Sequence, residues 1–143
     1  MIKSKILCFS FFAVLSFSSK LLADAPGYVY QVIAENLEHP WGIAVLDNND
    51  LLVTELSGQL RLIKNGTLVD RPIEGVPGVL FAGQGGLSGI AIDPNYSQNK
   101  KIYLAFSSPD EQKKTNSLEV ISASLNETAL TNVKTIFRAS PSR

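Results

Sequence analysis

The chain is predicted to be all-β and to form part of a β-propeller, with about two blades present. Three observations predict this: short β-rich runs separated by turn residues, no helical period longer than one or two turns, and a repeat of multi-strand units 47 residues apart. A repeat of about 40 to 50 residues with several strands per unit is typical of propeller blades. Because a closed ring needs roughly four to eight blades, two units form only part of one.

Residues 1–23 are predicted to be a secretory signal peptide. Lys3 and Lys5 form a basic start, Ile6 to Phe17 an apolar core, and Leu21-Leu22-Ala23 a cleavage site before Asp24. The alternative, a transmembrane anchor, is disfavoured because the apolar core has about a dozen residues, whereas a bilayer span needs roughly 20. We therefore expect residues 24–143 to be periplasmic or secreted, with membrane contact only during export.

Seven strands are expected, and six of them fall into two units. The first unit contains Trp41–Leu46, Leu51–Glu55 and Leu60–Lys64; the second contains Leu87–Ile92, Ile102–Phe106 and Leu118–Leu125; Tyr28–Ala34 precedes both. Asp47-Asn48-Asn49-Asp50, Ser57-Gly58 and Asn65-Gly66 predict hairpin turns at the strand ends.

The repeat favours blades over the alternative of a compact seven-stranded sandwich. Trp41-Gly42-Ile43-Ala44-Val45 aligns with Ser88-Gly89-Ile90-Ala91-Ile92, and a second and a third strand follow each segment. A sandwich fits the strand count but does not explain this repeat. Two blades by themselves would leave two apolar faces and two sheet edges exposed, so a stable monomer is not expected from this chain alone.

Composition and motifs exclude several classes of function. Beyond residue 23 the chain has 10 basic and 13 acidic residues, so no nucleic-acid partner is expected. The single cysteine, Cys8, lies inside the predicted signal, which leaves the exported part without disulfides or cysteine metal ligands. Asp47 and Asp50 lack the glycine and glutamate of a calcium loop and are interpreted as turn residues. Neither a Gly-x-Ser-x-Gly hydrolase motif nor a P-loop is present.

Four motifs carry a resemblance to a known family: Leu37-Glu38-His39-Pro40-Trp41-Gly42-Ile43-Ala44, Leu51-Leu52-Val53-Thr54-Glu55, Gly83-Gln84-Gly85-Gly86-Leu87 and Asp93-Pro94-Asn95-Tyr96. Their order and spacing resemble those of the soluble aldose sugar dehydrogenases of the glucose/sorbosone dehydrogenase family. The likeness runs roughly from Leu37 to Phe137. It implies a six-bladed β-propeller that binds pyrroloquinoline quinone (PQQ) and calcium, and an intact protein that oxidises aldose sugars to lactones and passes electrons to an acceptor.

The resemblance implies that Gln84 contacts PQQ. A glutamine amide offers two donors and an acceptor to the carboxylate and carbonyl oxygens of this flat molecule. Gly83, Gly85 and Gly86 would let the backbone approach it without Cβ clashes. The alternative is a glycine-rich turn at the entrance to a strand, with Gln84 exposed and without a role.

No catalytic residue and no metal ligand is predicted in this chain. The only histidine, His39, is interpreted as structural, with Pro40 expected to keep it extended. Trp41 and Glu55 are interpreted as packing or hydrogen-bonding elements of the first blade. In the resembling family the catalytic histidine follows a segment like Thr135-Ile136-Phe137-Arg138, so it would come just after Arg143, and the calcium ligands match nothing here.

The 143-residue chain is accordingly expected to be inactive by itself and not to bind the cofactor. The alternative function is a non-catalytic extracellular propeller that binds a protein or a glycan.

Overall fold

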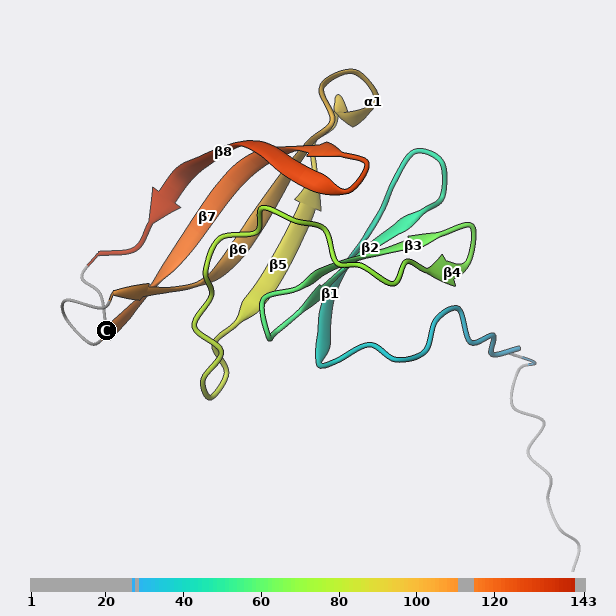
Figure 1. Cartoon of the computed structure of the whole chain (residues 1–143), viewed down its shortest axis with the longest axis horizontal. Coiled ribbons are helices and arrows are strands. Elements are labelled where there is room, and N and C mark those ends of the chain that lie inside the picture. The colour runs from blue at the N-terminus through green and yellow to red at the C-terminus, as the bar shows by residue number, and fades with distance from the viewer. Residues whose placement is uncertain (1–26, 28, 111–114, 141–143) are drawn as a thin grey trace, which may run out of the picture. The chain divides into compact units, whose positions relative to one another are not determined.

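The computed structural model describes residues 27, 29–110 and 115–140. The predicted signal peptide and Cys8 lie outside this range. The described residues form two four-stranded sheets with consecutive antiparallel strands (Figure 1). No helix in this part of the chain is long and apolar enough to cross a bilayer.

The first sheet is a meander of strands joined by tight turns. It contains β1 (Pro40–Val45), β2 (Leu51–Glu55), β3 (Leu60–Lys64) and β4 (Thr67–Leu68) in that order. Asp50 is a turn residue, as predicted: its carboxylate accepts hydrogen bonds from the Asn65 backbone N–H at 2.9 Å and from the Asn48 side chain at 2.7 Å. These bonds hold the β1–β2 and β3–β4 turns together.

The second sheet repeats this plan with longer outer strands. It contains β5 (Leu87–Ile92), β6 (Lys101–Asp110), β7 (Thr115–Asn126) and β8 (Ala129–Arg138), with the short helix α1 (Tyr96–Asn99) between β5 and β6. The Asp93 carboxylate organises this connection. It accepts hydrogen bonds from the Tyr103 hydroxyl at 2.6 Å, the Asn95 backbone N–H at 2.9 Å and the Asn99 side chain at 3.0 Å.

The predicted repeat is confirmed at the level of individual residues. β1 and β5 hold the same place in their sheets, and each carries an irregularity of register near its start, between Pro40 and Gly42 and between Leu87 and Gly89. Each unit also has a fourth strand that was not predicted. β4 has only two residues, and β8 has a mostly exposed surface, so neither shows the apolar alternation on which a strand prediction depends.

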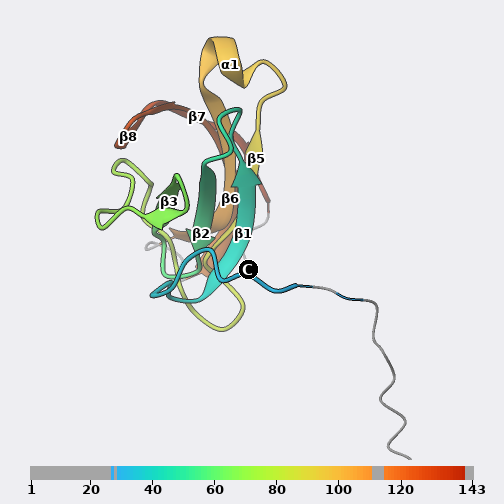
Figure 2. The same cartoon turned by 90° about the vertical axis from the view of Figure 1, so that its right-hand side faces the viewer.

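The core lies between the two sheets. Leu52 and Leu60 of the first sheet pack in one cluster with the fully buried Leu104, Phe106 and Ile121 of the second. β1 and β2 contact β5, and Figure 2 shows β1 in front of the second sheet.

The connection from β4 to β5 bonds to β3 of the first sheet and to the start of β8 in the second. Ile73 is buried, and its backbone N–H donates to the Leu60 carbonyl. The Glu74 N–H donates to the Thr128 carbonyl, and the Glu74 carbonyl accepts from the Leu130 N–H. This segment therefore runs between β3 and the start of β8 (Figure 1).

The strand predicted at Tyr28–Ala34 is wrong. Residues 29–34 contain no strand. Val32 and Ile33 are 73% and 53% exposed, so these β-branched residues are not packed against a sheet face that would stabilise an extended pairing.

Candidate cofactor site

The predicted site residues lie where several strand ends meet. β1 and β5 begin at the same end of their sheets at which β2 and β6 finish, because the strands alternate in direction. Residues 38–39, 56–59, 79–86 and 107–108 therefore gather there. We call this region the Gln84 end; it lies at the lower edge of the two sheets in Figure 1.

The loop that carries Gln84 is anchored on both sides. The Leu80 N–H donates to the Ser107 carbonyl at 2.8 Å, and the Ser107 N–H donates to the Gly86 carbonyl at 3.0 Å. Between these anchors a turn closes by a bond from the Gly85 N–H to the Ala82 carbonyl, and Gln84 is exposed at its tip. This placement fits both interpretations of the loop, cofactor contact and plain turn.

Packing within the protein explains why Gly85 and Gly86 are glycines, whereas the sequence had suggested the close approach of a ligand. Gly86 has φ 152°, and a Cβ there would lie 2.4 Å from the Leu56 carbonyl oxygen, which accepts the Leu87 N–H at 3.2 Å. A Cβ on Gly85 would lie 2.9 Å from the Ser107 hydroxyl. Both glycines thus allow close approach of the protein's own chain, whereas Gly83 has open space around it.

His39 was predicted to be extended, and this is wrong. Its φ is 50°, in the left-handed region, even though Pro40 follows. The turn is held from outside, because the Glu38 N–H donates to the Glu55 carboxylate at 2.7 Å and the His39 carbonyl accepts from the Leu56 N–H at 3.1 Å. This conformation brings the exposed His39 ring to 5.4 Å from the ring of Phe81, in the Gln84 loop.

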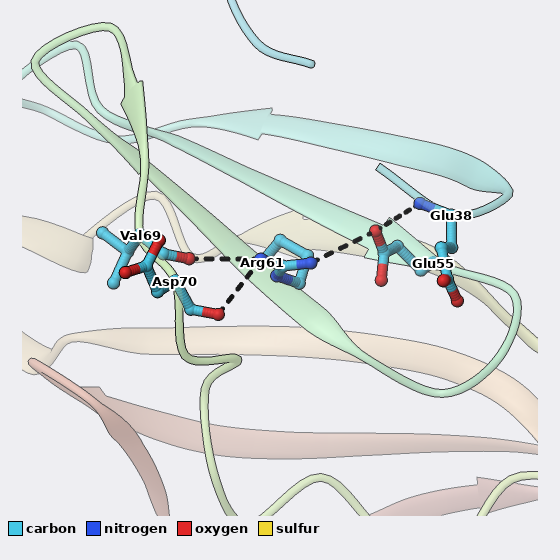
Figure 3. A network of polar contacts seen from close by, with 5 residues as sticks. All are labelled: Glu38, Glu55, Arg61, Val69 and Asp70. Atoms are coloured by element: carbon cyan, nitrogen blue, oxygen red, sulfur yellow. Dashed lines mark hydrogen bonds and ion pairs between the residues drawn. The ribbon is translucent and has the colours of Figure 1, made fainter. Parts of the chain in front are cut away.

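Glu55 and Arg61 form a buried pair beneath this turn (Figure 3). Arg61 Nη1 lies 3.6 Å from Glu55 Oε1, and Arg61 Nη2 donates to the carbonyls of Val69 and Asp70. Glu55 is therefore a hydrogen-bonding element of the first sheet, as predicted. Trp41, by contrast, is largely exposed, so its predicted packing role is not met within the described residues.

The Gln84 end carries the exposed amide of Gln84 and two accessible rings that contact each other, those of His39 and Phe81. These groups suit one side of a flat ligand that carries carbonyl and carboxylate oxygens. Within residues 27, 29–110 and 115–140 there is no group of three or more His, Cys, Asp or Glu side chains that could hold a metal ion. The described residues thus fit a contact with PQQ.

Comparison with known proteins gives the family. The model of the glucose/sorbosone dehydrogenase family matches residues 37–143, which is most of the chain. This chain belongs to that family. The matched region begins at Leu37, where the motifs of the first sheet begin, and it includes the whole Gln84 loop.

Two solved structures that are similar to this chain are of aldose sugar dehydrogenases. The soluble enzyme of Escherichia coli, in its apo form, superposes with a TM-score of 0.73 at 32% identity over 78% of this chain and 33% of its own. The PQQ-bound enzyme of Streptomyces coelicolor gives 0.68 at 29% identity over 78% and 34%. In sequence, the aldose sugar dehydrogenase YliI of Escherichia coli K12 is 34% identical over 136 residues.

These comparisons confirm the predicted fold class, an incomplete β-propeller with about two blades. They also show that the chain spans only 37% of the length of YliI.

Sequence reasoning missed three contributors to this end. Phe81 gave no signal, because its contact with His39 depends on a left-handed turn 42 residues earlier. Arg61 could have been noticed as a single charge in the apolar run Leu60–Ile63. Thr54, which links the sheets, looks like an ordinary strand residue in the sequence.

Proposed function

We propose that the complete gene product containing this chain is an exported, PQQ-dependent dehydrogenase that oxidises aldose sugars to lactones. Family membership and the likeness to aldose sugar dehydrogenases support this proposal. The observation that carries it furthest is the exposed Gln84 loop in a fold shared with a PQQ-bound enzyme. Oxidation of the anomeric carbon removes two electrons and two protons, and bound PQQ would supply the site that accepts the electrons.

The role of this chain's own residues in that reaction is to bind and orient. Gln84 donates from its amide to an oxygen of the cofactor, and the anchored loop holds the amide in place. The His39 and Phe81 rings border the same site. Calcium, the base that removes the hydroxyl proton, and the contact with an electron acceptor belong to other parts of the complete protein.

We also propose that the 143 residues alone are inactive and do not retain PQQ. The described residues offer one side of a site and no metal donor set. Residues 1–23 would direct export to the periplasm or the medium and then be removed.

The first test is to sequence the coding DNA beyond Arg143, express the complete product and titrate it with PQQ. We expect saturable PQQ binding and sugar-dependent reduction of an artificial electron acceptor. Gln84→Ala should weaken PQQ binding by about 1 kcal/mol or more, roughly fivefold in Kd, because one hydrogen bond to the cofactor is lost.

Gln98→Ala is the matched control, since Gln98 is an exposed glutamine on α1 at the opposite end of the second sheet. It should bind PQQ like the unmodified protein. A folded product that binds no PQQ would contradict the proposal and favour a non-catalytic propeller. Equal affinities of Gln84→Ala and Gln98→Ala would contradict only the role of Gln84.

A further inference from the structure

We infer that Glu55 is a positioning residue that holds the Gln84 end in the geometry needed for cofactor binding. This inference rests on the proposed function, since it assigns Glu55 to the same site. Glu55 does not face the ligand; it acts through the backbone of residues 38–39 and through its neighbour Leu56.

The burial of Glu55 calls for an explanation. The residue is 0% exposed at the end of β2, in a strand whose other side chains are apolar or threonine. A buried carboxylate is costly unless it is paired and hydrogen-bonded, and an apolar residue of similar size would pack there without that cost. The presence of a buried carboxylate at this position is therefore explained by the backbone segments whose conformation it stabilises.

The first of these groups is the backbone before β1. Glu55 Oε1 accepts the Glu38 N–H at 2.7 Å, one residue before the left-handed His39. A left-handed residue before proline is unfavourable and persists only when its surroundings determine it. The hydrogen bonds from the Glu38 N–H to the Glu55 carboxylate and from the Leu56 N–H to the His39 carbonyl stabilise the left-handed conformation of His39. Glu55 and Leu56 are consecutive residues at the end of β2.

The second group is the start of β5. The carbonyl of Leu56 accepts the Leu87 N–H and lies against Gly86, so the same strand end also supports the Gln84 loop. The His39 and Phe81 rings join the two supported segments on the outside. A shift of the Glu55 backbone would thus displace the Gln84 loop through the Leu56–Leu87 hydrogen bond and through the contact between His39 and Phe81.

Arg61 fixes the carboxylate itself. It lies 3.6 Å from Glu55 Oε1, while its other nitrogen is bound to the carbonyls of Val69 and Asp70 after β4 (Figure 3). Glu55 Oε2 has no partner among the described residues, so the carboxylate contributes through Oε1 alone. The pair therefore transmits the position of residues 69–70 to the Glu38–His39 turn.

The test uses the complete gene product and two variants of one position. Glu55→Leu removes the acceptor of the Glu38 N–H and should raise the Kd for PQQ by roughly tenfold, at the lower end of what supporting partners of site ligands contribute. Glu55→Gln keeps an acceptor oxygen and should restore most of the affinity. Glu127→Gln, at an exposed position in the β7–β8 turn, is the control and should bind PQQ like the unmodified protein.

A second readout is independent of the cofactor. Hydrogen exchange of the protein without PQQ should be faster in Glu55→Leu at residues 38–39 and 80–87, and unchanged around α1. Should Glu55→Leu fail to fold, Glu55→Asp decides, because its shorter side chain withdraws the acceptor oxygen from the Glu38 N–H. Faster exchange confined to the same residues supports the inference, and exchange equal to that of the unmodified protein overturns it.

The outcomes separate this inference from the proposed function. If the unmodified protein binds no PQQ, the proposed function fails, and hydrogen exchange alone then tests the positioning role. If it binds PQQ but a folded Glu55→Leu binds with the same Kd, only the positioning role is overturned. A lower melting temperature with unchanged Kd and evenly raised exchange would mean that Glu55 only stabilises the fold.

Discussion

Gly86 shows how a single residue sets the path of the chain at the candidate site. Its φ of 152° is rare for residues with a side chain, and the Leu56 carbonyl occupies the space that a Cβ would need. The glycine is thus required by contact between the two sheets, and the approach of a ligand is not needed to explain it. Gly86 lies in the same loop as Gln84, so the contact between Gly86 and Leu56 also helps to orient Gln84.

We predict that Gly86→Ala will lower the free energy of unfolding by about 1 to 3 kcal/mol, because a Cβ contact of 2.4 Å forces the backbone to move. Thermal or denaturant unfolding of the complete gene product measures the effect. Gly78→Ala is the control, since no atom lies within 4 Å of a Cβ at that exposed position. Equal stability of the two variants would show that Gly86 is not under steric constraint.

Asp93 links stability to pH. The hydrogen bond from the Tyr103 hydroxyl, followed by those from the Asn95 N–H and the Asn99 side chain, lowers the pKa of Asp93 from 3.8 to about 2. Because the folded state has the lower pKa, the stabilisation is fully present above about pH 4 and is lost as the pH falls towards 2. Asp93 thus favours the folded state of the β5–β6 connection near neutral pH.

We predict that Asp93→Asn will be less stable than the unmodified protein at pH 6 and will lose less stability between pH 4 and pH 2. Tyr103→Phe removes the largest cause of the pKa shift and should change the slope in the same direction. Unfolding free energies measured at several pH values test this. Parallel pH profiles for all three proteins would be incompatible with the assigned role of Asp93.

At the scale of elements, the hydroxyl of Thr54 in β2 links β1 to β5. Thr54 is fully buried, and its Oγ1 accepts the Gly42 N–H at 2.9 Å and donates to the Ser88 carbonyl at 2.9 Å. At Gly42 a Cβ would lie 2.6 Å from the same carbonyl. The distance between β1 and β5 is therefore set by Gly42, which has no Cβ, and by the bridging hydroxyl of Thr54.

We predict that Thr54→Val will cost about 1 to 3 kcal/mol of unfolding free energy, because the shape is kept but two partly buried backbone groups, the Gly42 N–H and the Ser88 carbonyl, lose their partner. Thr131→Val is the matched control: the Thr131 hydroxyl also bonds a carbonyl, that of Ser124, but in an exposed position. Unfolding measurements on both variants make the comparison. A loss as large in Thr131→Val would show that burial between the sheets is not what makes the hydroxyl important.

At the scale of the whole molecule, the outward side of β1 is apolar and exposed. Trp41, Ile43 and Val45 are 66%, 62% and 59% exposed, whereas Gly42, which alternates with them along the strand, lies against Ser88 and Ile90 of the second sheet. Neighbouring blades bury such faces in a propeller, because each unit contacts only its neighbours. The 143 residues produced alone would keep this face in water.

We therefore predict that the 143-residue chain alone will associate and will bind an apolar dye such as ANS. Ile43→Lys should reduce both effects, since it places a charge in the centre of the face. Light scattering and dye fluorescence are the measurements, with Thr67→Lys, an exposed polar position on β4, as the control. A monomeric chain without dye binding would mean that this face needs no partner.

The sequence by itself determined the all-β class, the two units and the bounds of three strands, whereas the ends of β1, β6 and β7 differ from the predicted ones by one to four residues. Alternating apolar residues and turn dipeptides are local signals, and β2, β3 and β5 end where those signals end. The repeat showed that the β1 and β5 segments hold equivalent places. The motif around Gln84 was likewise visible, because a glycine-rich run before a strand is itself a local pattern.

Only the tertiary structure decided how the candidate site is supported. The left-handed His39, its contact with Phe81 and the buried Glu55–Arg61 pair join residues that are distant in sequence. The tertiary structure also removed the strand predicted at Tyr28–Ala34, since no neighbour pairs with it. Local propensity limits the conformations that each segment can adopt. Long-range hydrogen bonds and packing between the two sheets then determine which of these conformations is stable in the folded protein.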